Sequence, residues 1–141
     1  MSGFEAYHGG ASACLHASGD DAWEFIQSQT TQNLPAAGDP TWSYGLWLNE
    51  NGRVLADTFA YAQASDSCLL WSFDCPAERL DATMRRNLVA DRVEITSMAG
   101  DLEFTILVGE SMEALLSRLG WNAPGPSGVV ETDDFILADY G

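Results

Sequence analysis

Apolar and polar residues alternate along two neighbouring stretches in the middle of the chain, residues 41–48 (TWSYGLWL) and 54–62 (VLADTFAYA). Alternation with a period of two predicts half-buried strands. The dipeptide Asn51-Gly52 between them predicts a type I′ turn, which needs positive φ at both central positions. Small residues share one face of the second strand, a pattern that suits close packing under a helix. The two stretches are therefore expected to form a β-hairpin.

Helical spacing marks three other segments. Apolar residues recur along Ala22–Gln32, and again at Leu80, Met84 and Leu88 after the capping candidate Asp74. A shorter helix is expected over Met112–Leu119. Further apolar runs predict strands at residues 13–17, 68–73, 92–96, 102–108, 129–131 and 135–138, and residues 1–12 are expected to be a loose lead-in.

The order of these elements is β-α-β-β-β-α-β-β-α-β-β. Strands in hairpins, interleaved with helices, predict an α+β fold with a largely antiparallel sheet and packed helices. At 141 residues the chain is long enough for one domain with a substantial core, so residues 1–141 are expected to form a single domain.

The charge of the chain narrows the range of partners. Its net charge is −15, with 21 acidic residues against six basic ones, all of them arginine. Such a surface repels phosphate backbones and anionic membrane faces, so neither nucleic acid nor membrane is expected as a partner. No apolar run reaches the length of a membrane span, and the first residues lack the basic start of a signal peptide. A cytoplasmic location is therefore expected.

Residues able to carry covalent or metal chemistry are few. The three cysteines, Cys14, Cys68 and Cys75, form no CxxC pair, which indicates reduced thiols and no iron–sulfur spacing. His8 and His16 lack metal-ligand spacing, and no nucleophile, phosphate-loop or zinc motif is present. No catalytic residue and no metal ligand is assigned.

The hairpin carries the better candidates for a binding site. Tyr44 and Tyr61 offer flat apolar surface, as Trp42 does, whereas Arg53 offers a fork of donors and Asp57 a pair of acceptors. A flat heterocycle with an amide edge and an acidic tail would suit such a set. The alternative is that the aromatic residues pack in the core and the charged residues lie on the rim.

Three stretches of the chain, in their order and spacing, resemble the folate-binding family that contains YgfZ and the glycine-cleavage T-protein. They are GDDAWEFIQSQTTQNL, SYGLWLNENGRVLADTFAY and LLWSFDCPAERLDATMRRNLVADRVEI. The first resembles the family's helix "D-A-x-x-F-L-Q-x-Q-x-T" and the second its hairpin "L-N-x-x-G-R-V-L-x-D". The match runs from about Leu15 to Ile95.

The resemblance implies a fold, a cofactor and a set of residues. The fold would be the N-terminal half of the T-protein and YgfZ folate-binding domain, with the C-terminal half of the family absent. The cofactor would be tetrahydrofolate or a one-carbon derivative, bound near Asn49, Arg53 and Asp57 with Tyr44 and Tyr61. The family pattern also marks Gly52 at the turn and, on the first helix, Gln27, Gln29 and Thr30, with Gln29 and Thr30 expected to tie the helix end to the sheet.

Two departures from the family pattern bear on activity. In the aligned T-proteins a carboxylate is expected early in the second helix, but Leu80 stands at that position, which disfavours aminomethyl transfer. The later YgfZ motif K-G-C-[YF]-x-G-Q-E does not occur in this chain.

The function implied is that of a YgfZ-like protein that supports iron–sulfur enzyme assembly or repair, or tRNA modification, through tetrahydrofolate. The alternatives are a folate-dependent aminomethyltransferase and a non-catalytic interaction module. Iron–sulfur enzymes would then be partners, and a second copy of the chain could supply the missing half of the domain.

Overall fold

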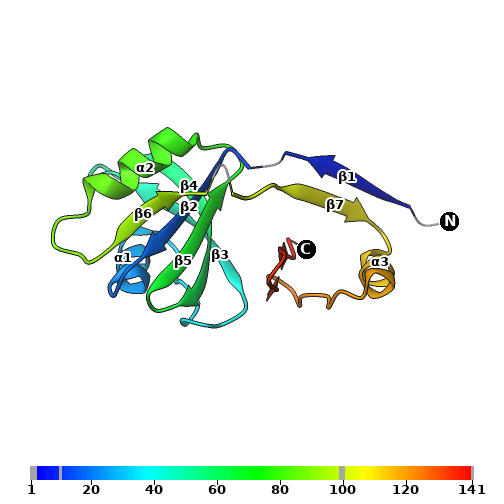
Figure 1. The fold of residues 1–141 in the computed structure, drawn as a ribbon. Coiled ribbons are helices and arrows are strands. Elements are labelled where there is room, and N and C mark those ends of the chain that lie inside the picture. The colour runs from blue at the N-terminus through cyan, green and yellow to red at the C-terminus, as the bar shows by residue number, and fades with distance from the viewer. Residues whose placement is uncertain (1–2, 10, 99–100, 141) are drawn as a thin grey trace.

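The computed structural model describes residues 3–9, 11–98 and 101–140. Within them the elements are Phe4–His8 (β1), Ala13–Ser18 (β2), Ala22–Gln29 (α1), Trp42–Leu48 (β3), Val54–Ala64 (β4), Ser67–Ser72 (β5), Ala77–Arg86 (α2), Glu94–Ser97 (β6), Thr105–Gly109 (β7), Met112–Leu119 (α3), Val129–Glu131 (β8) and Ile136–Ala138 (β9). Figure 1 shows one larger body built on a sheet, and a ribbon of β1 and β7 that reaches away from it towards α3.

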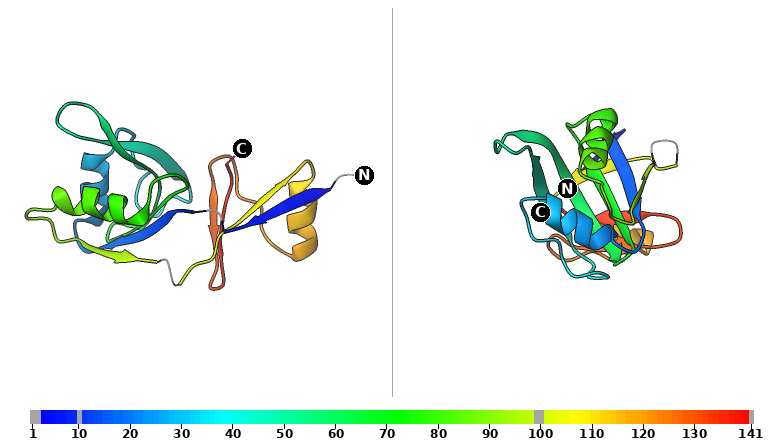
Figure 2. Two further views of the ribbon diagram at one scale, coloured as in Figure 1. Left: turned by 90° about the horizontal axis from the view of Figure 1, so that it is seen from above. Right: turned by 90° about the vertical axis from the view of Figure 1, so that its left-hand side faces the viewer.

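The larger body is built on a five-stranded sheet with the strand order β3-β4-β5-β2-β6. Every neighbouring pair in it is antiparallel, which confirms the predicted α+β fold with an antiparallel sheet. Both α1 and α2 pack on one face of this sheet, while the β8–β9 hairpin lies between the body and the ribbon (Figure 2).

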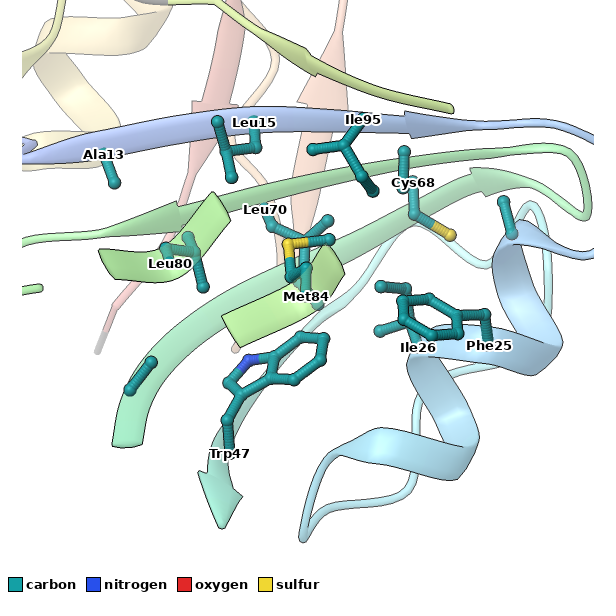
Figure 3. Close-up of a cluster of buried hydrophobic side chains, with 14 of the residues drawn as sticks. Ala13, Leu15, Phe25, Ile26, Trp47, Cys68, Leu70, Leu80, Met84 and Ile95 are labelled. Atoms are coloured by element: carbon teal, nitrogen blue, oxygen red, sulfur yellow. The ribbon is translucent and has the colours of Figure 1, made fainter. Parts of the chain in front are cut away.

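The core between the sheet and the two helices follows the alternation of the strands. Trp47, Leu70, Leu80 and Met84 point into this space together (Figure 3). Each of them is at most 1% exposed. The indole nitrogen of Trp47 donates a hydrogen bond of 3.1 Å to Oγ1 of Thr58, so the buried hydroxyl has a partner. Three of the small residues predicted to face a helix, Ala56, Thr58 and Ala60, are buried, whereas the fourth, Val54, is 58% exposed.

The turn between β3 and β4 is not of type I′. Gly52 has a φ of +76°, but among the described residues Ser127 is the one non-glycine residue with positive φ, so Asn51 does not adopt the required conformation. The N–H of Gly52 donates to the carbonyl of Asn49 at 3.0 Å, and the N–H of Asn49 donates to the carbonyl of Arg53 at 2.9 Å. The loop therefore has three residues, with glycine at its left-handed position.

A bulge follows this turn. Trp47 pairs with Ala56, but Leu48 pairs with Val54, so Leu55 is an extra residue on β4. A bulge breaks the alternation of side chains along a strand. Arg53 and Asp57, four residues apart, would share a face of an unbroken strand, but the bulge lies between them.

The predicted lead-in at residues 1–12 contains a strand. β1 pairs antiparallel with β7 over its whole length, from Phe4 opposite Gly109 to His8 opposite Thr105. All five residues of β1 are exposed. A strand without a buried face has no need for alternating apolar and polar residues, so the sequence pattern did not predict it. Its existence depends on a partner about a hundred residues away.

The helix ends differ slightly from the prediction. α1 ends at Gln29, and Thr30 forms a bridge to Trp47 of β3, so Thr30 does tie the helix to the sheet. Pro76 is the N-cap of α2, with no side-chain cap from Asp74. Gly120 ends α3 with a φ of 74°. Among the described residues, no helix has the length and apolar character needed to cross a membrane.

Candidate functional site

The second face of the sheet, opposite the helices, carries a cluster of aromatic rings centred on Phe59. Its ring centroid lies between 5.0 and 5.7 Å from those of five others, namely Tyr44, Trp42, Tyr140, Phe73 and Trp71. We call these six residues the aromatic cluster. They come from β3, β4, the end of β5 and the C-terminal segment, by which we mean Asp139 and Tyr140 after β9. Only the folded chain brings these parts together.

The C-terminal segment packs against one side of the aromatic cluster. The indole of Trp42 donates to the carbonyl of Asp139 at 2.6 Å, and the indole of Trp71 donates to the hydroxyl of Tyr140 at 2.7 Å. Val129 of β8 is buried in the same layer. These contacts give Trp42 and Trp71 a packing role, as the alternative interpretation of the aromatic residues expected.

Tyr44, whose ring centroid lies 5.0 Å from that of Phe59, also contacts Asp57. The hydroxyl of Tyr44 donates to Oδ2 of Asp57 at 2.7 Å. This hydrogen bond, followed by partial burial and the negative charges of Asp57 and Asp74, raises the pKa of Tyr44. Tyr44 is 41% exposed and Asp57 half-buried, so the pair combines an accessible ring with a partly desolvated carboxylate.

Ser72 is a functional candidate that sequence reasoning missed. Its hydroxyl, 1% exposed, donates to Oδ1 of Asp57 at 3.1 Å and accepts the backbone N–H of Cys75 at 3.0 Å. The serine is the last residue of β5, and the register that sets Phe59 opposite Trp71 brings it beside Asp57. Nothing in the local pattern of the sequence reports that register.

Asn49 and Arg53 are placed at the hairpin turn. Oδ1 of Asn49 accepts the backbone N–H groups of Asn51 and Arg53, both at 2.9 Å, so this side chain stabilises the loop. Arg53 is exposed and forms no ion pair with any other residue in the described part of the chain. Its guanidinium is thus open to an anionic group.

Tyr61, the fifth predicted binding residue, is directed towards β8. Its hydroxyl donates to Oε2 of Glu131 at 3.1 Å, and Nε2 of Gln63 donates to the other oxygen of Glu131 at 2.6 Å. Burial, followed by the hydrogen bond and the charge of Glu131, raises the pKa of Tyr61 to about 12. The structure therefore brings Tyr44 and Asp57 together, and places Tyr61 where it anchors the C-terminal hairpin.

Leu80, which stands where the family pattern carries a carboxylate, belongs to the core. It is completely buried in the core on the helix face of the sheet, opposite to the aromatic cluster. The position at which the family pattern carries a carboxylate is therefore occupied by an apolar core residue in this chain. That Leu80 disfavours aminomethyl transfer stays a prediction.

The cysteines are buried free thiols. Burial raises the pKa of Cys14 to about 11 and, together with the nearby charge of Asp66, that of Cys68 to about 12. Burial also raises the pKa of Cys75, partly offset by Arg79. Within the described residues, no group of three or more histidine, cysteine or acidic side chains is arranged to hold a metal ion.

Comparison with known proteins adds a family and a fold. The model of the GCVT N-terminal domain family matches residues 12–123. The crystal structure of glycine cleavage system aminomethyltransferase T from Bartonella henselae is similar over 94% of this chain, with a TM-score of 0.79 and 16% sequence identity. At that identity the likeness establishes the fold alone. The chain spans 37% of the length of that aminomethyltransferase, and no curated protein matches its sequence.

Proposed function

Because the chain belongs to the GCVT N-terminal domain family, we propose that it binds tetrahydrofolate as the N-terminal half of a T-protein-like or YgfZ-like folate-binding domain. The observation that carries this proposal is the Tyr44–Asp57 pair, in which the aromatic cluster presents a 41% exposed ring beside a half-buried carboxylate. A pterin ring is flat and presents adjacent N–H donors along one edge. A carboxylate accepts two such donors, and an aromatic ring stacks on such a heterocycle.

The residues have separate roles in this proposal. Asp57 accepts the N–H edge of the pterin, and the ring of Tyr44 lies against the heterocycle. Arg53, exposed at the hairpin turn, meets the glutamate tail of the folate through charge-assisted hydrogen bonds. Asn49 stabilises the loop that carries Arg53. Tyr61 holds the β8–β9 hairpin through its hydrogen bond to Glu131.

Titration with tetrahydrofolate under anaerobic conditions tests the proposal. Wild type is expected to bind, and Asp57→Asn is expected to bind about 30-fold more weakly, because one charge-assisted pairing of about 2 kcal/mol is lost. Asp91→Asn is the matched control, since Asp91 is an exposed acidic residue in the loop before β6 and lies outside the proposed site. Equal affinity of Asp57→Asn and wild type, or no binding by wild type, would contradict the proposal.

The physiological role that we propose is YgfZ-like support of iron–sulfur enzymes, including those that modify tRNA. The resemblance of the helix and hairpin motifs supports it. In cells that lack a YgfZ-type protein, the wild-type chain is expected to restore the activity of an iron–sulfur tRNA-modifying enzyme, and Asp57→Asn is not. If wild type and Asp57→Asn restored the enzyme activity equally, the role in cells would not depend on folate binding at Asp57.

Aminomethyl transfer is the second candidate function. It is favoured by the structural likeness to an aminomethyltransferase and by the half-buried carboxylate of Asp57 on the aromatic face. Incubation with an aminomethylated carrier and tetrahydrofolate, followed by detection of methylenetetrahydrofolate and free ammonia, distinguishes the two functions. Product formation that Asp57→Asn abolishes would favour the transferase.

We further propose that two copies of the chain build the folate site together. The β1–β7 ribbon supports this, because β1 and β7 each have one neighbouring strand among the described residues and all five residues of β1 are exposed, which leaves strand edges open to a second copy. Native mass spectrometry with and without tetrahydrofolate is expected to show a dimer that takes up folate. A monomer that binds folate would show that the single chain suffices.

A further inference from the structure

We infer that Ser72 is a positioning residue that holds the carboxylate of Asp57 in one orientation towards the ligand. The inference rests on the proposed function, because a fixed orientation of this carboxylate increases affinity only if the carboxylate binds a ligand. It goes further by assigning a role to Ser72, which lies within the third stretch of the resemblance and within the family match but is given no role by either.

The hydrogen bonds of Ser72 determine where its hydroxyl proton points. The serine oxygen accepts the N–H of Cys75 at 3.0 Å, which fixes the side chain at the start of the loop that leads into α2. The hydroxyl is then free to donate, and Oδ1 of Asp57 lies 3.1 Å away. Because Ser72 is 1% exposed, water does not compete for this donor.

Asp57 is thus held from both neighbouring strands. Tyr44 on β3 donates to Oδ2 and Ser72 on β5 donates to Oδ1, so each carboxylate oxygen has one hydroxyl donor. A carboxylate oxygen has two acceptor sites, so one on each oxygen remains for the adjacent N–H groups of a ligand. Two fixed donors hold the Asp57 side chain in one χ1 rotamer, and with it the carboxylate, before the ligand arrives, which is preorganisation.

Thr58 offers a matched control. It follows Asp57 in sequence, is also 1% exposed, and its hydroxyl accepts a hydrogen bond from Trp47. Its side chain faces the helices, whereas Asp57 takes part in the layer of the aromatic cluster. Thr58→Val and Ser72→Ala therefore each remove one buried hydroxyl from the same sheet, but only Ser72→Ala removes a donor to Asp57.

The first measurement needs no ligand. Three-bond NMR couplings about χ1 of Asp57 report whether its side chain occupies one rotamer or several. We expect a single rotamer in wild type and in Thr58→Val, and averaged couplings in Ser72→Ala. A single Asp57 rotamer in all three proteins would overturn the inference, whatever the outcome of the folate titrations.

The second measurement is a double-mutant cycle with tetrahydrofolate. Ser72→Ala is expected to weaken binding about five- to tenfold in the wild-type background, and less than twofold in the Asp57→Ala background, because the group that it positions is then gone. The same loss in both backgrounds, or a loss equal to that of Thr58→Val, would overturn the positioning role. If wild type does not bind tetrahydrofolate, the proposed function fails, and the couplings alone decide the role of Ser72.

Discussion

The hydroxyl of Tyr44 donates a hydrogen bond of 2.7 Å to Oδ2 of Asp57 across the two strands of the β3–β4 hairpin. Tyr44 pairs directly with Phe59, and Asp57 pairs with Leu46, so the two residues are diagonal neighbours on one face of the sheet. This diagonal contact joins an exposed ring to a half-buried carboxylate. It is the feature of the molecule from which the proposed ligand site is built.

Removing the hydroxyl of Tyr44 tests this contact. Tyr44→Phe is expected to weaken tetrahydrofolate binding by about 1 kcal/mol, roughly fivefold, because Asp57 loses one of its two fixed donors. Its effect on the free energy of unfolding is expected to be below about 1 kcal/mol, since the hydroxyl is accessible to water. Calorimetric titration and urea unfolding measure the two effects. The control is Tyr7→Phe on β1, where Tyr7 is also exposed; a loss of affinity in that variant would mean that the effect is not specific to the site.

Truncation of Leu80 tests its assignment to the core. Leu80→Ala is expected to lower the free energy of unfolding by about 2–5 kcal/mol, because a completely buried leucine leaves a cavity. Val89→Ala, at a residue that is 91% exposed, should change it by less than about 0.5 kcal/mol. Denaturant unfolding compares the two. Similar stability of both variants would contradict the placement of Leu80 in the core.

The contact between Tyr61 and Glu131 predicts a dependence of stability on alkaline pH. Burial, then the hydrogen bond and charge of Glu131, raises the pKa of Tyr61 from 10.0 to about 12, so the neutral phenol is favoured in the folded state. Its contribution is fully present below about pH 10 and is lost as the pH rises through about 12. The free energy of unfolding of wild type should therefore fall more steeply over this range than that of Tyr61→Phe. Parallel curves would show that Tyr61 titrates alike in the folded and unfolded chain.

The buried thiols predict low reactivity in the folded protein. Burial raises the pKa of Cys14 to about 11 and that of Cys68, with the charge of Asp66, to about 12, so little thiolate exists at pH 8. Iodoacetamide at pH 8 is expected to leave both unmodified in the native protein and to modify them after unfolding in guanidinium. Peptide mass mapping identifies the sites. Rapid modification of Cys68 in the native chain would contradict its placement in the core.

Much of the fold could be predicted from the sequence because its signals are local. Alternation predicted β3 and β4, and helical patterns predicted the helix that contains Leu80 and Met84 as well as the bounds Met112–Leu119 of α3. The buried face of β4 followed from the small side chains of Ala56, Thr58 and Ala60. These patterns report on residues a few positions apart, where the geometry of one strand or helix is already fixed.

The sequence by itself determined the class of the fold, the two faces of the hairpin and the resemblance to a folate-binding family. Only the tertiary structure decided that β1 pairs with β7, that a bulge separates Arg53 from Asp57, and that Ser72 reaches the carboxylate. It also placed Tyr61 on Glu131 and Leu80 in the core. The physical reason is the same for each. Strand register and the packing of distant segments are set by contacts between residues far apart in the chain, and local periodicity does not record them.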